Sequence, residues 1–149
     1  MRIRKATLTD AAIIADFNCR LAWETEQIRL DSATVNRGVR AVLKDEAKGT
    51  YFVVEADGEV IGQLLITYEW SDWRNGNFWW IQSVYVVAAY RQQGIFRALF
   101  EHVRKVAWSR RGVCGLRLYA ANHNRRAQRA YLRLGMTHTD YEVFELVFR

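Results

Sequence analysis

The 149-residue chain contains no proline and only two cysteines. It therefore has no Pro-rich linker, and it also has no internal repeat or low-complexity tract, so we expect a single domain over residues 1–149. Cys19 and Cys114 lie far apart, and neither is spaced with a His or a second Cys as metal ligands are. We expect both to be buried, unreactive thiols and expect no metal.

Long apolar runs are also missing. No stretch approaches the roughly 18 consecutive apolar residues that a membrane helix needs, and the N-terminus lacks the apolar run of a secretory signal. A cytoplasmic protein that does not bind membranes is expected. Hydrophobic residues make up 50% of the chain and aromatic residues 13%, which excludes an intrinsically disordered protein.

Acidic residues are scarce in one part of the chain. Residues 91–133 contain eleven Lys or Arg against Glu101 alone, a net charge of +10, whereas the whole chain has +6, so the remainder carries 6 − 10 = −4. This asymmetry implies an anionic partner, such as nucleic acid, a membrane surface or a phosphorylated cofactor. The ordinary alternative is a solvated basic helix face.

Hydrophobic periodicity predicts both helices and strands, and three consecutive antiparallel strands are the simplest arrangement for residues 51–87. Helices are expected after Thr9 or Asp10, after Asp31 or Ser32 and ending at Gly49, from Gly94 to Gly112, and from Asn124 to Gly135. Strands are expected over residues 2–7, 51–56, 59–69, 78–87, 114–120 and 141–148. Asp57-Gly58 is typical of a tight type I′ hairpin turn.

The segment 85–96, YVVAAYRQQGIF, joins a strand to a helix N-terminus. The first N–H groups of a helix lack intrahelical partners and lie at the positive end of the helix dipole, so they favour a phosphate. Gly94 would let the backbone approach that phosphate closely, while Arg91 and Arg97 could add charge-assisted hydrogen bonds. This junction alone is a weak signal, because a glycine here is also ordinary turn chemistry.

The run R-x-x-G at Arg91 to Gly94, followed by Asn124, Ala127, Tyr131 and Gly135, resembles the GCN5-related N-acetyltransferase (GNAT) family. The order of predicted elements is similar to that fold over nearly the whole chain. The resemblance implies an acetyl-CoA-dependent transferase. It also implies an α/β (α+β) fold with a mixed, mostly antiparallel sheet flanked by helices. This sheet would splay open between the strand ending at Val87 and the strand 114–120, and acetyl-CoA would lie in that opening.

The resemblance also implies residue roles. The backbone of Tyr85, Val86 and Val87 would pair with the pantetheine, Asn124 would bond the cofactor arm, and Tyr131 would be the general acid that protonates the leaving thiolate. The turn expected to hold the pyrophosphate comprises Arg91, Gln92, Gln93, Gly94, Ile95, Phe96 and Arg97. Phe96 departs from the family pattern of Gly or Ala, and we expect its side chain to point into the core.

The general base is less clearly marked. Relatives often have a carboxylate on the strand 78–87, where this chain has Gln82 and Ser83. Glu69 is the preferred candidate, although an acceptor that arrives deprotonated needs no base. Glu24 and Glu26, in the break between the first two helices, would contact substrate.

Aromatic residues gather in and beside the loop 70–77, with Trp70 and Trp73 the candidate substrate-binding residues. Aromatic rings around a carboxylate would suit a cationic or aromatic amine, and the alternative is a dimer interface.

The favoured function is therefore transfer of an acetyl group from acetyl-CoA to a primary amine, on a small molecule or a protein, by direct attack in a ternary complex. An acetyl-enzyme at Cys114 is not supported, because no His neighbours it in sequence. The alternatives are a basic nucleic-acid-binding module, which we favour less, and a CoA-binding regulator without turnover. Family habit and the surplus of aromatic residues favour a homodimer.

Overall fold

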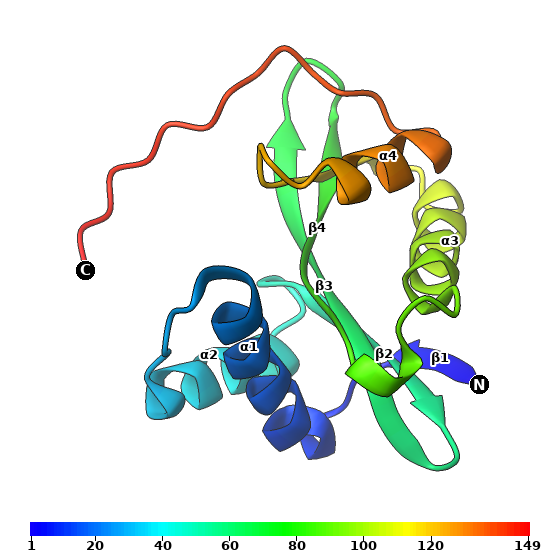
Figure 1. Ribbon diagram of the computed structural model, residues 1–149. Coiled ribbons are helices and arrows are strands. Elements are labelled where there is room, and N and C mark those ends of the chain that lie inside the picture. The colour runs from blue at the N-terminus through cyan, green and yellow to red at the C-terminus, as the bar shows by residue number, and fades with distance from the viewer. The chain divides into compact units, whose positions relative to one another are not determined.

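The computed structural model describes all 149 residues, which fall into two units, Met1–Tyr119 and Ala120–Arg149 (Figure 1). The first unit consists of β1 (Arg2–Lys5), α1 (Ala11–Glu26), α2 (Ser32–Lys44), β2 (Thr50–Ala56), β3 (Glu59–Ser71), β4 (Gly76–Val86), α3 (Ile95–Trp108) and β5 (Val113–Leu118). Short 3₁₀ helices, η1 (Leu8–Asp10) and η2 (Ala88–Tyr90), precede α1 and follow β4. The second unit contains α4 (Arg125–Arg133) and the C-terminal segment.

The five strands form one sheet in the order β1-β2-β3-β4-β5. All neighbours are antiparallel except β4 and β5, which are parallel. Asp57 and Gly58 join β2 to β3 with φ angles of 52° and 79°, as a type I′ turn requires. The predicted mixed, mostly antiparallel sheet and its first hairpin are therefore confirmed.

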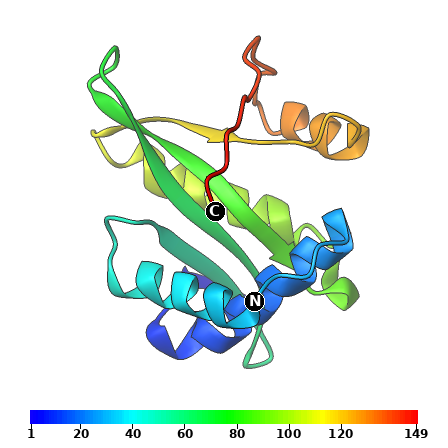
Figure 2. The ribbon, with the colours of Figure 1, turned by 90° about the vertical axis from the view of Figure 1, so that its left-hand side faces the viewer.

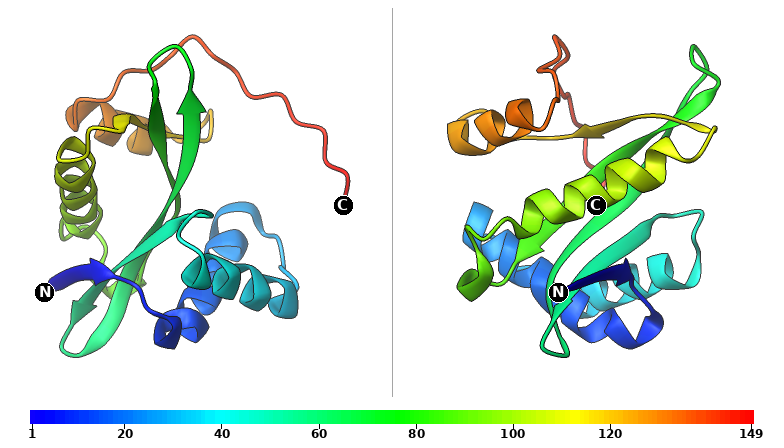
Figure 3. Two further views of the ribbon diagram at one scale, coloured as in Figure 1. Left: turned by 180° about the vertical axis from the view of Figure 1, so that it is seen from behind. Right: turned by 90° about the vertical axis from the view of Figure 1, so that its right-hand side faces the viewer.

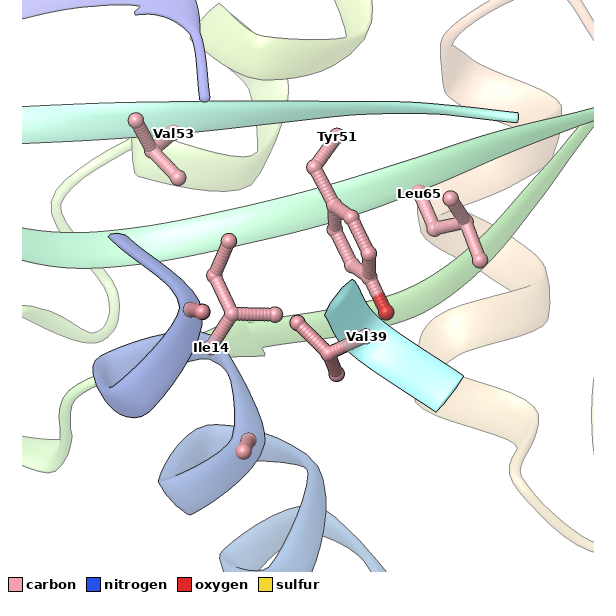
Figure 4. Packing of buried hydrophobic residues seen from close by; sticks show 7 residues of the cluster. Ile14, Val39, Tyr51, Val53 and Leu65 are labelled. Carbon is pink, nitrogen blue, oxygen red and sulfur yellow. The ribbon is translucent and has the colours of Figure 1, made fainter. Parts of the chain in front are cut away.

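Helices cover both faces of this sheet. Figures 2 and 3 show α1 and α2 on one face and α3 on the other. On the first face, Ile14 of α1 and Val39 of α2 pack in one buried cluster with Tyr51, Val53 and Leu65 of the sheet (Figure 4). The Tyr51 ring reaches from β2 toward the helices, so this cluster connects the helix layer to the sheet.

The strand β4 changes its surroundings halfway along its length. Asn77–Ile81 pair with β5, but no partner follows them on that side, so the edge of β4 beyond Ile81 is open. At the same place a β-bulge interrupts the pairing with β3: Gln63 pairs with Tyr85 and Leu65 with Gln82, so Leu64 alone opposes Ser83 and Val84. Ser83 has a φ of 50°. The predicted splay of the sheet between β4 and β5 is confirmed.

In the second unit, α4 begins as predicted. The Asn124 side-chain oxygen accepts a hydrogen bond from the Ala127 N–H at 3.1 Å, which is the usual helix N-cap contact. Gly135, with a φ of 94°, follows the helix end. The predicted strand over 141–148 is wrong: these residues have no regular secondary structure, because no backbone groups pair with theirs.

Two smaller predictions are also wrong. The second helix ends at Lys44 instead of Gly49, because Asp45 already has an extended backbone with φ −145° and ψ 99°. Cys114 is exposed at the sheet edge rather than buried, while Cys19 is partly buried. No helix of the structure has the length and apolar character needed to cross a membrane.

Candidate active site

The open edge of β4 presents backbone groups from alternate residues. The Val87 N–H donates to the Ile61 carbonyl at 2.9 Å, so it points toward β3. Since successive residues of a strand direct their backbone groups to opposite sides, Tyr85 also faces β3, whereas Val84 and Val86 face the open edge. Of the three residues expected to pair with pantetheine, only Val86 has this orientation. Val84 was missed, although alternation from Val86 could have found it.

Arg91 holds the end of β4 in place. Its Nε donates to the Val86 carbonyl at 2.8 Å, and its Nη2 donates to Glu24 Oε1 at 2.7 Å. The guanidinium also lies 5.3 Å from the centroid of the Tyr85 ring, within cation–π range. Arg91 therefore binds the protein itself, and its charge is partly compensated by Glu24.

Glu24, near the end of α1, completes a cluster with Tyr85 and Arg91. The Tyr85 hydroxyl donates to Glu24 Oε2 at 2.6 Å. This hydrogen bond, followed by the one from Arg91, holds the pKa of Glu24 below its ordinary range, while burial raises the pKa of Tyr85. A cavity of about 290 Å³ opens beside the cluster, lined also by Val84 and Val86. Glu24, which was expected to contact substrate, thus anchors the end of β4 and the turn that follows it to α1.

The turn before α3 contains two residues with left-handed backbone conformations. Gln92 and Gly94 have φ angles of 62° and 78°, and the Gln93 side chain donates to the Ala89 carbonyl at 3.0 Å. The first hydrogen bond of α3 runs from the Ala98 N–H to the Gly94 carbonyl, so the N–H groups at Ile95 and Arg97 point out of the helix end. A Cβ placed at Gly94 would meet no atom within 4 Å. This open space at the positive end of a helix dipole fits a pyrophosphate.

Phe96 does not obstruct this turn. Its side chain is partly buried, and its ring lies 6.1 Å from that of Phe100, a fully buried residue of α3. Arg97, in contrast, is exposed. The expectation that Phe96 points into the core is confirmed, and the neighbouring Arg97 supplies positive charge at the helix N-terminus.

A larger cavity of about 550 Å³ lies between α1, α2 and the sheet. Most of its lining is apolar and comes from both helices, including Leu21, Val35 and Val39. Glu26 is the only charged residue that lines it. Of the candidate substrate contacts, Glu26 is therefore the one that the structure places on a cavity of substrate size.

The floor of this larger cavity is polar. Asn18, Tyr51 and Ser83 line it, and Gln63 lies beneath them with no exposed surface. The Gln63 amide donates to Asn18 Oδ1 at 2.8 Å and to the Ser83 carbonyl at 3.0 Å, and Asn18 donates to the Tyr51 hydroxyl at 3.2 Å. Burial raises the pKa of Tyr51. Gln63 Oε1 has no partner, so this buried network retains an unused acceptor.

Glu69 lies at the other end of the sheet. It pairs in register with Phe78, five residues before Ser83, which corresponds to about 16 Å along the strand. It accepts from Arg117 at 2.7 Å and from the Trp80 indole at 3.0 Å, and these donors hold its pKa below the ordinary range. Glu69 is therefore an ion-paired carboxylate. It does not lie at the bulge, where a general base would act.

The tryptophans expected near the acceptor separate in the structure. Trp70 and Trp73 are exposed in and beside the β3–β4 turn, Trp73 at 86% of its surface, on the same remote end of the hairpin as Glu69. Trp79 is buried against Tyr68, with ring centroids 6.2 Å apart. No contact brings Trp70 or Trp73 to the larger cavity, whose lining they do not join.

Asn124 and Tyr131 belong to the second unit. The Asn124 oxygen caps α4, so one of its polar atoms has a structural role. Tyr131 is partly buried, and this burial raises the pKa of its hydroxyl, which is therefore protonated at neutral pH. The roles implied for both residues toward acetyl-CoA stay predictions.

Comparisons with known proteins agree with this geometry. Residues 15–136 match the family model described as the acetyltransferase (GNAT) family. A crystal structure of a possible acetyltransferase from Clostridium difficile 630 is 44% identical, with a TM-score of 0.93 over 99% of this chain and 97% of that one. A predicted acetyltransferase from Clostridium acetobutylicum, solved with acetyl-CoA, shares the fold, with 20% identity and a TM-score of 0.78 over 98% of this chain and 95% of that chain.

A curated relative is the thialysine N-epsilon-acetyltransferase of Bos taurus, which is 33% identical over 88 residues. The match covers 56% of this chain and 51% of that protein, so the chain spans about half the length of this relative. The family model covers most of the chain, and the fold and both motifs agree with it. The chain therefore belongs to the acetyltransferase (GNAT) family, whose members are acetyl-CoA-dependent N-acetyltransferases.

Proposed function

We propose that this protein transfers the acetyl group of acetyl-CoA to a primary amine whose apolar body occupies the 550 Å³ cavity between α1 and α2. One observation carries the proposal. Ser83 lines this cavity and also lies where the open edge of β4 begins. A donor bound along the open edge and an acceptor bound in the cavity would therefore meet at the bulge, as direct transfer in a ternary complex requires.

The donor side fits acetyl-CoA, which supplies a thioester as the source of the acetyl group. Backbone groups of Val84 and Val86 would pair with the pantetheine amides, and the turn at Gly94 would receive the pyrophosphate. The Arg91 side chain would act by holding Val86 and the turn in position, since its donors already bind Val86 and Glu24. The exposed Arg97 would contribute the charge.

The acceptor side favours a small amine over a protein. The volume of about 550 Å³ lies within the roughly 300–1,000 Å³ of typical small-molecule sites, and the apolar lining would bury a hydrocarbon body. Glu26 would attract a cationic amine from solvent. The name of the bovine relative, thialysine N-epsilon-acetyltransferase, places its acceptor amine at an ε position, and a side-chain amine of that kind would suit this cavity.

The chemistry needs few groups. The amine nitrogen attacks the carbonyl carbon, the N–C bond forms, and the C–S bond breaks with its electron pair leaving on sulfur. Backbone N–H groups at the bulge would stabilise the charge that develops on the carbonyl oxygen. No carboxylate lies on the cavity floor, so we infer that the amine loses its proton to water before or during attack. Tyr131, protonated at neutral pH, would protonate the thiolate.

Filling the cavity tests the acceptor site. Gly38 of α2 lines the cavity, and a Cβ placed there meets no atom within 4 Å, so the side chain of Gly38→Leu begins in open space beside the cavity. We expect the KM for an aliphatic amine to rise about tenfold or more while the Kd for acetyl-CoA, measured calorimetrically, stays unchanged. Ala33→Leu, on an exposed position of the same helix, is the matched control and should change neither value. An unchanged KM in Gly38→Leu would place the acceptor elsewhere.

Tyr131→Phe tests the general acid. Loss of a positioned proton donor lowers rates by roughly 10²- to 10⁴-fold, so kcat should fall at least about 100-fold while acetyl-CoA affinity is retained. The measurement is steady-state acetylation at saturating concentrations of both substrates. Unchanged turnover would remove Tyr131 from the reaction and leave the acceptor site unaffected.

A further inference from the structure

A fully buried glutamine, Gln63, lies in β3 among apolar neighbours. It has no exposed surface, and Leu64 and Ile66, which follow it in the same strand, are equally buried. Its Oε1 has no hydrogen-bond partner. A buried acceptor without a partner costs stability, so an apolar side chain of similar size would suit this core better. Packing therefore does not explain why an amide occupies this position.

The amide nitrogen of Gln63 reaches two different elements. It donates to Asn18 Oδ1 of α1 at 2.8 Å and to the Ser83 carbonyl of β4 at 3.0 Å. Asn18 in turn donates to the Tyr51 hydroxyl at 3.2 Å. Asn18, Tyr51 and Ser83 all line the larger cavity. One buried side chain thus connects the floor of that cavity to the bulge.

Ser83 has a backbone conformation that needs support. Its φ of 50° lies in the left-handed region, which is uncommon for residues other than glycine and persists where the surrounding structure holds it. Ser83 is also one of the two residues of β4 that oppose Leu64 alone, and a bulge leaves its extra residue outside the regular ladder. The Gln63 side chain supplies this irregular residue with a hydrogen bond.

The direction of the Ser83 carbonyl fixes the direction of the N–H that follows it. The chain has no cis peptide bond, so the Ser83 carbonyl and the Val84 N–H, which belong to one peptide, point in opposite directions. Because the carbonyl is directed to the Gln63 amide, the Val84 N–H points away from it, toward the open edge of β4. A thioester bound along this edge would meet that N–H at the bulge.

We propose that Gln63 is a positioning residue for acetyl transfer. It holds the Ser83–Val84 peptide so that the Val84 N–H donates to the thioester carbonyl oxygen as negative charge develops there. A donor that is oriented in advance stabilises the transition state more than the bound substrates. Gln63 lines neither of the two cavities, so it acts through this peptide and not by contact with a substrate. Its role rests on the acetyl transfer proposed above, but not on which cavity receives the acceptor.

The carbonyl of bound acetyl-CoA reports on this donor without any acceptor. In wild-type protein saturated with acetyl-CoA labelled with carbon-13 at the carbonyl, we expect the carbonyl signal to lie downfield of that of free acetyl-CoA, because a hydrogen bond polarises the carbonyl. Gln63→Met keeps similar bulk but removes the amide. It should lose most of this shift while the calorimetric Kd for acetyl-CoA stays unchanged. An equal shift in both proteins would overturn the proposal, and a failure of the acceptor cavity would leave this test intact.

Gln82→Met is the matched control. Gln82 is a partly buried glutamine next to Ser83, and its amide donates to the Thr67 hydroxyl of β3, not to the bulge carbonyl. Single-turnover acetylation of hexylamine compares the two variants. Removing an oxyanion donor lowers rates by roughly 10²- to 10³-fold, so a misdirected donor in Gln63→Met should slow transfer about tenfold or more. Gln82→Met should transfer at the wild-type rate, and an equal loss in both variants would overturn the proposal.

Glycine at the bulge separates positioning from a general loss of structure. Glycine adopts a positive φ without a steric penalty, so Ser83→Gly allows the bulge to form without the amide. We expect Ser83→Gly with Gln63→Met to regain part of the carbonyl shift and to transfer faster than Gln63→Met alone. A double variant that regains neither would overturn the proposal. In wild-type protein both Gln63 side-chain amide hydrogens should exchange slowly with solvent, and rapid exchange would overturn it even if Gln63→Met did not fold.

Discussion

The two ends of β4 carry the same chemical grouping in different settings. At the paired end, Glu69 accepts hydrogen bonds from Trp80 and Arg117, and at the open end Glu24 accepts from Tyr85 and Arg91. Each cluster joins one carboxylate, one aromatic donor and one arginine. The Glu69 cluster links three neighbouring strands, whereas the Glu24 cluster links a helix to the strand end and the turn that follows it.

This difference shows that a carboxylate beside aromatic residues does not by itself indicate a catalytic group. Both carboxylates have lowered pKa values, and both are ion-paired. The two carboxylates differ in whether the neighbouring part of β4 is paired on both sides. Beside Glu69, β4 is paired on both sides, so no backbone donor is available for a ligand. Beside Glu24 the strand has an open edge, and cavities adjoin it.

Of the variants that distinguish the two ends of β4, Gly94→Val should have the largest effect, and only at the open end. The new side chain would occupy the space that we assign to the pyrophosphate, so we expect the Kd for acetyl-CoA to rise about tenfold or more, a loss of at least about 1.4 kcal/mol. Isothermal titration with acetyl-CoA measures it. Gly58→Val is the matched control, because Gly58 has nearly the same φ, 79° against 78°, but lies in the β2–β3 turn. Equal affinity in both variants would contradict the phosphate cradle.

Gly115→Ala should affect the paired end alone. A Cβ at this position of β5 would lie 2.8 Å from Cε1 and 3.1 Å from Cδ1 of the buried Phe78 ring. Overpacking by one methyl group costs about 1 kcal/mol of unfolding free energy, which urea denaturation would detect. Acetyl-CoA affinity should not change. Gly112→Ala, where a Cβ meets nothing within 4 Å, should leave stability intact, and equal losses in the two variants would exclude overpacking as the cause.

Glu24→Gln and Glu69→Gln compare the two clusters directly. Both remove a charge from a solvent-accessible ion pair, so each should cost about 1 kcal/mol of stability or less. Only Glu24→Gln frees Arg91 from its carboxylate, and we expect the KM for acetyl-CoA to rise about fivefold in that variant. Steady-state kinetics should show wild-type values for Glu69→Gln. A fall in kcat there would restore Glu69 as a base.

The smallest effect is on the pH dependence of stability. Because the folded protein lowers the pKa of Glu24 and Glu69, each contributes stability above the ordinary Glu pKa of about 4.3, and loses it as the pH falls through the folded-state pKa. The Tm difference between wild type and the double variant Glu24→Gln with Glu69→Gln should therefore narrow as the pH falls below about 4. A Tm difference that stays constant down to pH 2 would contradict this linkage.

The sequence predicted most elements because their signals are local. The Asp57-Gly58 turn, the Asn124 cap and the apolar stripe of α3 each depend on residues within a few positions of one another. The left-handed glycine before α3 was predicted for the same reason, and its role toward phosphate stays a prediction. The family motif supplied the splay of the sheet, which no local pattern shows.

The errors have non-local causes. Glu24 meets Tyr85 and Arg91 across separations of 61 and 67 residues, so its role as an anchor has no sequence signal. Trp70 and Trp73 are close in sequence to Tyr68 and Trp79, but the long β3–β4 hairpin carries them away from the bulge. The segment 141–148 has the pattern of a strand, yet a strand also needs a neighbour, and no backbone group pairs with this segment.

The bulge at Ser83 has a consequence for comparing this protein with its relatives. The extra residue puts Tyr85 and Gln82, an odd and an even position, on the same face of the sheet, because their partners are Gln63 and Leu65. A relative with the same number of residues but no bulge would pair one residue out of step beyond this point. Every residue from Val84 to Val86 would then exchange faces, and the tyrosine would turn away from Glu24. A relative that lacked one residue here would instead lose the bulge and keep its tyrosine opposite the equivalent of Gln63. A one-residue gap at this point of an alignment is therefore compatible with the same site.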